Sequence, residues 1–127
     1  MKPRFRAWLK KKQEMDNEID HISWLEDELY CIGDGITYMV SAEDLVLMQS
    51  TGLKDKNGKE IFEGDILDYK GRKALVRWHG SYASFIYRFV DELQKRNTEW
   101  KPLYLAYMKC EIIGNIYENR ELLEDKK

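Results

Sequence analysis

The sequence has few of the features that would place it in a specialised class of proteins. It holds two cysteines, Cys31 and Cys110, too few and too far apart for a disulfide framework or a zinc site. No apolar run approaches the roughly 20 residues that cross a bilayer, and the opening residues, MKPRFRAWLKKK, lack the apolar segment of a signal peptide. We therefore expect a cytoplasmic protein without a membrane partner. Both thiols are interpreted as small buried side chains, with a single disulfide as the less favoured alternative.

Motifs of known enzyme classes are also lacking. The sequence has no glycine-rich phosphate loop, no GxSxG elbow and no HExxH helix. His21 and His79, taken with the two cysteines, match no spacing known for metal ligands. We therefore expect no catalytic residues, no metal, no cofactor and no small-molecule substrate, so that the protein is not an enzyme. A hydrolase would need a cluster of carboxylates, for which Glu63, Asp65 and Asp68 are the candidates.

The sequence does contain enough apolar residues for a core, together with charges that are separated along the chain. Of its 127 residues, 43% are hydrophobic and 13% aromatic. The net charge is only -2, but residues 1–12 carry +6, residues 13–53 carry -10 and residues 54–127 carry +2. Two patches of opposite charge are therefore expected in one soluble domain.

The basic block at the N-terminus is the candidate binding surface. Its members are Arg4, Arg6, Trp8, Lys10, Lys11 and Lys12. Bases that neutralise phosphates supply most of the non-specific affinity for nucleic acid, and a tryptophan among them could stack on nucleotide bases or contact another subunit. The competing interpretation is that these bases complement the acidic block, within one subunit or across an interface. We favour complementation because the pI of about 5.8 lies well below the value of about 9 that nucleic-acid-binding domains usually exceed.

Short alternating segments predict strands in the first fifty residues. Residues 4–9 alternate between apolar and polar side chains, which predicts a half-buried strand. Residues 19–25 and 28–32 are predicted as two further strands, although a helix over residues 18–29 is the alternative because its apolar residues also fit helical spacing. The region is completed by a strand at 36–40, a helical turn at 41–44 and a buried strand at 45–48.

Turn signals divide the rest of the chain. Asn57-Gly58 predicts a type I′ hairpin, because both residues accept a positive φ. Gly64-Asp65 and Gly114-Asn115, each followed by isoleucine, are expected to bind backbone amides at a strand entry. The expected structural motif comprises Gly52, Asn57, Gly58, Gly64, Asp65, Gly114 and Asn115. Strands are expected at 66–69, 74–78, 82–89, 103–108 and 110–113, with a short helix or ordered loop at 90–101 and with Trp78, Phe85 and Tyr87 in the core.

Many short strands with glycine, asparagine and aspartate between them predict a mostly β fold with little helix. We expect one continuous domain over residues 1–127. Within it, an N-terminal β region, residues 1–50, is expected to pack on a small SH3-like barrel region, residues 51–127.

Two segments echo each other and carry a resemblance to a known family. The run LMQSTGLKDKNGKEIFEGDI at residues 47–66 is followed by EIIGNIYENREL at residues 111–122, with RFRAW before them and VRW between them. In this order, and with Gly52, Gly58 and Gly64 at fixed spacing, they resemble the YopX family of phage and prophage proteins. The resemblance implies a small β-rich fold with an SH3-like barrel, a gene carried by a phage or a prophage in a bacterial host, and no established activity.

Taken together, these features predict a phage or prophage accessory protein of unknown biochemical function. We expect a non-enzymatic binding or scaffold-type protein that forms homo-oligomers. The alternative is a nucleic-acid-binding module that uses the basic N-terminal segment.

Overall fold

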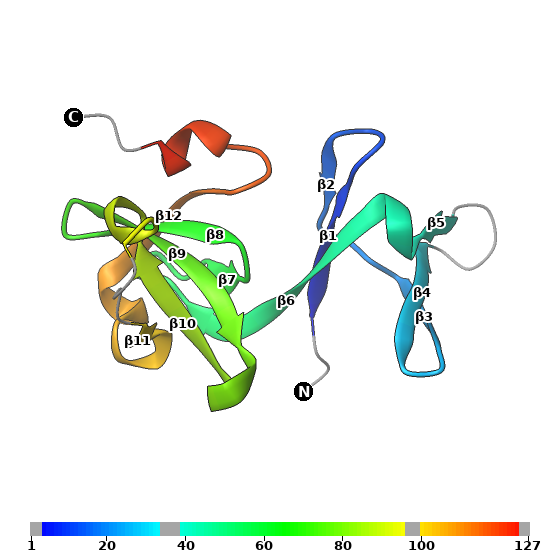
Figure 1. The fold of residues 1–127 in the computed structure, drawn as a ribbon, viewed down its shortest axis with the longest axis horizontal. Helices are drawn as coiled ribbons and strands as arrows, with labels where there is room; N and C mark the ends of the chain where they lie inside the picture. The colour runs from blue at the N-terminus through cyan, green and yellow to red at the C-terminus, as the bar shows by residue number, and fades with distance from the viewer. Residues whose placement is uncertain (1–3, 34–38, 96–99, 125–127) are drawn as a thin grey trace. The chain divides into compact units, whose positions relative to one another are not determined.

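The computed structural model of the protein describes residues 4–33, 39–95 and 100–124 (Figure 1). The described chain consists mainly of strands, and its helical segments are 3-10 turns of three or four residues. The predicted mostly β class with little helix is thus confirmed. The chain divides into two compact units, Met1–Gln49 and Ser50–Lys127. In the described part of the chain, every helix is too short to cross a membrane.

In the first unit, β1 (Phe5–Leu9) lies between β2 (Glu14–Asp16) and the first half of β6 (Leu45–Lys54). All of these pairs are antiparallel, and Leu9 is opposite Leu45. The side chains from Arg6 to Leu9 are all buried. The strand was thus predicted correctly, but its description as half-buried was wrong, because a central strand of a ladder can be covered on both faces.

The acidic part of the first unit forms a second sheet, with the strand order β3 (His21–Leu25), β4 (Glu28–Gly33) and β5 (Met39–Ser41). The strands predicted at 19–25 and 28–32 are confirmed, and the helical alternative is excluded. The predicted helical turn is the 3-10 helix η1 (Ala42–Asp44), although the Ser41 side chain makes no capping hydrogen bond. Most of the predicted strand at 36–40 lies outside the described residues.

The second unit is built on a five-stranded antiparallel sheet, which Figure 1 shows as a curled surface. Its strands, in spatial order, are β11 (Lys101–Pro102), β10 (Ser84–Phe89), β9 (Arg72–His79), β8 (Asp65–Tyr69) and β12 (Cys110–Asn115). The short strand β7 (Glu60–Phe62) pairs with the second half of β6. The 3-10 turns are η2 (Gly80–Tyr82), η3 (Val90–Glu92), η4 (Leu103–Leu105), η5 (Tyr107–Lys109) and η6 (Arg120–Leu123). The SH3-like topology of this unit stays a prediction.

The strand predicted at residues 103–108 is wrong. This segment folds as η4 and η5, and Ala106 donates its amide to the Leu103 carbonyl at 2.9 Å. A turn with a period of three places Leu103 and Ala106 on one side, where both are buried, and leaves Tyr104 and Leu105 exposed. The buried residues of this segment are thus three apart, as in a 3-10 turn, rather than two apart, as in a half-buried strand.

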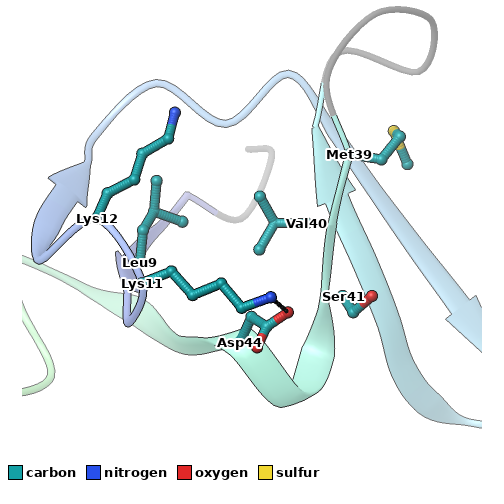
Figure 2. Close-up of a pocket in the computed structure, with 7 residues that line it drawn as sticks. All are labelled: Leu9, Lys11, Lys12, Met39, Val40, Ser41 and Asp44. Carbon is teal, nitrogen blue, oxygen red and sulfur yellow. Dashed lines mark ion pairs between the residues drawn. The ribbon is translucent and has the colours of Figure 1, made fainter.

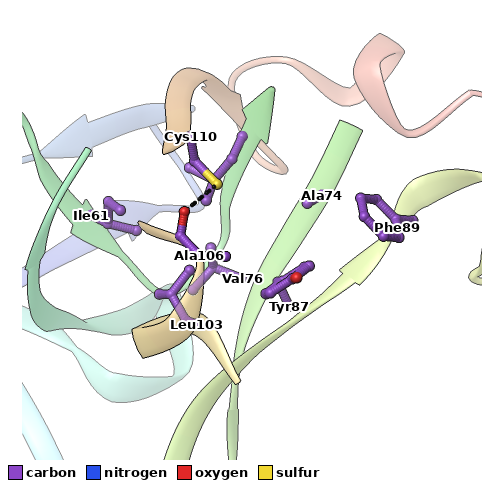
Figure 3. Packing of buried hydrophobic residues seen from close by; sticks show 9 residues of the cluster. Ile61, Ala74, Val76, Tyr87, Phe89, Leu103, Ala106 and Cys110 are labelled. Carbon is purple, nitrogen blue, oxygen red and sulfur yellow. Dashed lines mark hydrogen bonds between the residues drawn. The ribbon is translucent and has the colours of Figure 1, made fainter. Parts of the chain in front are cut away.

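The core of the second unit collects side chains from both ends of its sequence (Figure 3). Its buried members are Ile61, Leu67, Ala74, Val76, Tyr87, Phe89, Leu103, Ala106 and Cys110. The prediction of a core position is confirmed for Tyr87 and is wrong for Trp78, whose side chain is 46% exposed. Trp78 lies near the end of β9, where its ring and that of Phe85 are in T-shaped contact with centroids 5.0 Å apart. Phe85 itself is half-buried beside the core.

Candidate functional site

The turn between β6 and β7 is organised by one buried carboxylate. Asp55 accepts hydrogen bonds at Oδ1 from the amides of Asn57 and Lys59, both at 2.9 Å, and at Oδ2 from the amide of Ile112 at 2.9 Å. Burial alone would raise the pKa of this carboxyl, but the amides of Ile112, Lys59 and Asn57 outweigh that effect and lower it below the ordinary value. Asp55 thereby ties the turn to β12, a role that the sequence analysis missed.

The predicted type I′ geometry of this turn is wrong. Gly58 has a φ of +81°, but Asn57 is not among the described residues with positive φ. The Gly58 amide donates to the Asp55 carbonyl at 3.0 Å, and the Asp55 amide donates to the Lys59 carbonyl at 2.8 Å. These contacts are typical of a three-residue hairpin loop in which a left-handed glycine follows a type I turn. The Asp55 side chain favours this longer loop because it binds two amides within it.

The two Gly-Asx pairs that echo each other in the sequence meet in space. Asp65 and Asn115 are register partners in the β8–β12 ladder. Asp65 accepts the Phe62 amide at 2.8 Å, and Asn115 Oδ1 accepts the amides of Tyr117 at 3.0 Å and Glu118 at 2.8 Å. Both side chains therefore bind backbone amides at a strand end. Two further glycines of the motif, Gly52 and Gly64, have φ values of +76° and +90°.

The structure divides the predicted basic surface into a buried part and a paired part. Arg6 and Trp8 are buried, at 7% and 5% exposure. Lys10 donates through Nζ to the carbonyl of Glu43 at 3.1 Å, and Lys11 Nζ lies 3.4 Å from the Asp44 carboxylate. Lys10 and Lys11, at the β1–β2 turn, thus contact the acidic block of the same unit. The binding role proposed for Arg4, Arg6, Trp8 and the three lysines stays a prediction.

A pocket of about 210 Å³ lies beside this ion pair (Figure 2). Figure 2 shows the Lys11 ammonium directed at Asp44, with Leu9 of β1 and Val40 of β5 near this ion pair. The residues that line the pocket are Leu9, Lys11, Lys12, Met39, Val40, Ser41 and Asp44. The pocket therefore combines an apolar wall with two lysines of the basic block.

The tip of the β3–β4 hairpin exposes apolar side chains that the sequence analysis did not single out. Trp24, Leu25 and Tyr30 are 55%, 61% and 60% exposed. Between them, Glu26 and Asp27 have φ values of +51° and +68°, and Leu25 pairs with Glu28. Two consecutive positive φ angles in a two-residue loop are typical of a type I′ turn, here formed without glycine or asparagine. The hairpin is thus an exposed apolar surface joined by a strained acidic turn.

Comparison with known proteins identifies the family. The family model described as YopX protein matches residues 4–124. The chain belongs to the YopX family. Among solved structures, it is similar to the crystal structure of protein EF1440 from Enterococcus faecalis, with 30% sequence identity, a TM-score of 0.64, and coverage of 98% of this chain and 99% of that chain. No curated protein matches it. Neither the YopX description nor the name of this relative states an activity.

Two of the carboxylates considered for a hydrolase, Asp65 and Asp68, are engaged in the fold of this YopX family member. Asp65 and Asp68 each accept a backbone amide, from Phe62 at 2.8 Å and from Gly71 at 3.1 Å. Among residues 4–33, 39–95 and 100–124, His, Cys, Asp and Glu form no group of three that could hold a metal ion. The carboxylate cluster that a hydrolase would need is therefore not formed by Asp65 and Asp68.

Both cysteines are buried, as predicted, and both are free thiols, so the alternative of a disulfide is wrong. The Cys110 thiol contacts the Ala106 carbonyl at 3.3 Å. Burial, with the nearby charges of Asp68 and Asp55, raises the pKa of Cys110 to about 11. A thiol in this state is a poor nucleophile at neutral pH.

Proposed function

We propose that this member of the YopX family is a non-enzymatic binding protein that self-associates, and that it is an accessory protein of a phage or prophage. The observation that carries the proposal is the tip of the β3–β4 hairpin. It exposes Trp24, Leu25 and Tyr30 beside three acidic residues, Glu26, Asp27 and Glu28. Aromatic side chains are enriched at protein–protein interfaces, and such anchors often supply much of the binding energy.

The backbone of the hairpin supports an interaction role. A left-handed conformation costs roughly 1–2 kcal/mol for a residue with a side chain, and Glu26 and Asp27 both adopt it. Strained backbone of this kind is found at binding sites, where the turn fixes the direction of flanking side chains. Here the turn keeps Leu25 and Glu28 paired across the hairpin, and the rings of Trp24 and Tyr30 close to it are exposed.

A second copy of the chain offers a complementary surface. The pocket beside the β1–β2 turn has an apolar wall from Leu9 and Val40, and it is also lined by Lys11 and Lys12. The Lys11 side chain is 80% exposed although it pairs with Asp44, so it has room for a second carboxylate. An acidic, aromatic hairpin of one subunit and a basic, apolar pocket of another match in charge and in chemistry.

The alternative, a nucleic-acid-binding module based on the N-terminal segment, has less support. It uses Trp8 as a stacking ring, but this side chain is buried. It also uses Lys10 and Lys11, which already contact the Glu43 carbonyl and the Asp44 carboxylate. Complementation within the unit, the competing interpretation of the sequence, accounts for both contacts.

Light scattering coupled to size-exclusion chromatography tests self-association. We expect the wild-type chain to elute as a dimer or a larger assembly, and the Trp24→Ser/Leu25→Ser variant to elute as a monomer. Leu105→Ser is the control, because it removes a leucine of similar exposure from the other unit and should leave the mass unchanged. A monomeric wild type at high concentration, or an unchanged mass for the double variant, would refute the proposal.

Charge reversal tests which surfaces meet. Lys11→Glu/Lys12→Glu and Glu26→Lys/Asp27→Lys should each weaken association, because each places like charges in contact. A mixture of the two variants should associate more strongly than either alone. Circular dichroism verifies that each variant is folded. If mixing restores no association, the hairpin does not bind this pocket.

A further inference from the structure

Four side chains of the second unit form a continuous row of rings and one cation. Tyr82 stacks on His79 with ring centroids 4.4 Å apart, His79 meets the edge of Trp100 at 5.8 Å, and the Arg88 guanidinium lies 4.3 Å from the Trp100 ring. Tyr82 is 69% exposed, so one ring face lies against His79 and the other is open to solvent. The row thus leads from an exposed ring to a partly enclosed arginine.

The row ends at a pocket on the outer face of the β9–β10 ladder. Side chains alternate between the faces of a strand, so Arg77 lies on the face opposite the core residue Val76. Because Arg77 is opposite Ile86, Arg77 and Arg88 are diagonal neighbours on this outer face. Both line a pocket of about 300 Å³ whose other lining residues are Leu75, Leu93, Trp100, Ile116 and Leu123.

Neither of these arginines is neutralised by an acidic side chain in the described part of the chain. Arg72, on the same strand as Arg77, is by contrast paired with acids, because its guanidinium lies 2.8 Å from the Asp91 carboxylate and 3.0 Å from that of Glu92. The Nε of Arg88 and the Nδ1 of His79 are buried and have no hydrogen-bond partner among the described residues. Of these two atoms, the Arg88 Nε–H belongs to a residue that lines the pocket, and leaving this buried donor without an acceptor costs about 1–3 kcal/mol. The pocket therefore suits an anion that brings acceptor oxygens.

We infer that this row is a binding surface for single-stranded nucleic acid. A backbone phosphate binds between Arg77 and Arg88, because a guanidinium offers paired donors that match phosphate oxygens. A neighbouring base stacks on the open face of Tyr82, as bases of any sequence do on exposed aromatic rings. A carboxylate ligand would account for the two arginines but not for the ring row beside them. The surface lies in the second unit and is separate from the N-terminal basic block.

The inference is tested by fluorescence anisotropy with labelled oligothymidylate at 50 mM salt, within the range in which phosphate contacts are strong. We expect Arg77→Gln/Arg88→Gln to weaken binding by about tenfold or more. The slope of log K against log salt should fall by about 0.7 for each phosphate that the variant no longer binds. Arg72→Gln is the control, since it removes one guanidinium from β9, the strand of Arg77, at a position where acids already pair with it; the affinity of this variant should stay within about twofold of wild type.

Tyr82→Ala separates base stacking from phosphate binding. This exposed side chain can be removed without disturbing the core, and its loss should weaken oligothymidylate binding by about fivefold or more. Binding of an abasic oligonucleotide of the same length should be unchanged, because it has no base to stack. Duplex DNA of the same length should bind more weakly than the single strand to the wild-type protein.

Three results would overturn the inference. The first is the absence of binding to oligothymidylate at 50 mM salt, the low end of the range in which such contacts are measured. The second is an equal loss in Arg72→Gln and in the double arginine variant, which would indicate a general charge effect. The third is equal affinity for duplex and single strand. None of these results bears on self-association through the β3–β4 hairpin, which is measured separately by molecular mass.

Discussion

Asp65 and Asn115 are opposite each other in the β8–β12 ladder, so the two echoing segments of the sequence are cross-strand partners. The amide of Ile116 donates to the carbonyl of Gly64 at 3.0 Å, which extends the pairing beyond the strand ends. Each Asx side chain also binds amides of its own turn. Similar sequences recur here because the two strand ends have the same requirement for amide acceptors.

Asn115→Asp should destabilise the fold in a pH-dependent way. The Asn115 side chain donates through Nδ2 to the Glu118 carboxylate at 2.8 Å, and a carboxylate at position 115 would replace this hydrogen bond by repulsion. We expect a loss of about 1–3 kcal/mol in the free energy of unfolding at pH 7. The loss should be smaller at pH 4, where protonation reduces the repulsion. Urea unfolding at the two pH values measures both.

Asn115→Ala is the control for that comparison. It removes the hydrogen bonds to Tyr117, Glu118 and the Glu118 side chain without adding a charge. Its destabilisation should therefore depend much less on pH. Equal pH dependence in the two variants would contradict the proposed repulsion.

Asp55→Asn should also destabilise the protein. An asparagine can accept through one oxygen only, so the amides of Asn57 and Lys59 or that of Ile112 would lose their acceptor. We expect a loss of about 1–3 kcal/mol at pH 7, since hydrogen bonds to a charged group are the stronger ones. Asp20→Asn, the same change at an exposed side chain, should have little effect.

The pH dependence of that loss follows from the lowered pKa of Asp55. The stabilisation from the ionised carboxyl is present above the ordinary pKa of about 3.9 and is lost as the pH falls through the lower pKa of the folded state. The difference between wild type and Asp55→Asn should therefore be largest near neutral pH and shrink in acid. A difference that grows below pH 4 would show that Asp55 does not stabilise the fold through its charge.

The strands of both units were largely predictable because their apolar patterns are local. The amide-binding turns at Asp65 and Asn115 were predictable in their chemistry, but two hairpin turns were predictable only in position. At Asn57-Gly58 the residue preferences favoured a type I′ loop, but Asp55 binds two amides and imposes a longer one. At Glu26-Asp27 two consecutive residues adopt positive φ although neither is glycine or asparagine. In both places a side chain or the strand register decided the backbone, and neither can be derived from local preference.

The candidate sites were less predictable than the fold. Arg88 and Trp100 come together because β10 pairs with β11, which Trp100 directly precedes, and this pairing depends on strand order. Trp78 and Trp8 show that the burial of a tryptophan does not follow from its neighbours in the sequence. Trp78 closely follows the apolar run Ala74–Val76 of β9 and is exposed, whereas Trp8 lies among basic residues and is buried.

Gly114→Ala should disturb the C-terminal turn. A Cβ atom at this position would lie 2.6 Å from Asn119 Oδ1 and 2.7 Å from Leu122 Cδ1. Overpacking of this size typically costs about 1–3 kcal/mol. Part of that cost should disappear in an Asn119→Ala background, which removes the nearer atoms, and thermal unfolding of the four proteins of this cycle measures the coupling.

Gly71→Ala separates crowding from backbone strain. Gly71 has a φ of +87°, and a Cβ there would meet no atom within 4 Å. Its substitution should cost roughly 1–2 kcal/mol through the left-handed backbone alone. Asn119→Ala should not change that cost. If Asn119→Ala reduces the destabilisation of Gly71→Ala as much as that of Gly114→Ala, the contact with Asn119 does not cause the destabilisation of Gly114→Ala.

Cys110 should resist thiol reagents until the protein unfolds. Its side chain is buried in the core of the second unit, and its pKa is raised to about 11. In the Cys31→Ala variant, which leaves Cys110 as the remaining thiol, a disulfide reagent at pH 8 should label the native protein slowly and the urea-unfolded protein rapidly. A folded pKa above the ordinary value of 9.0 means that the associated stability is complete below pH 9 and is lost as the pH rises toward 11. The Cys110→Ala variant should therefore lose less stability than wild type over that interval. Fast labelling of the native protein at pH 8 would contradict the burial of this thiol.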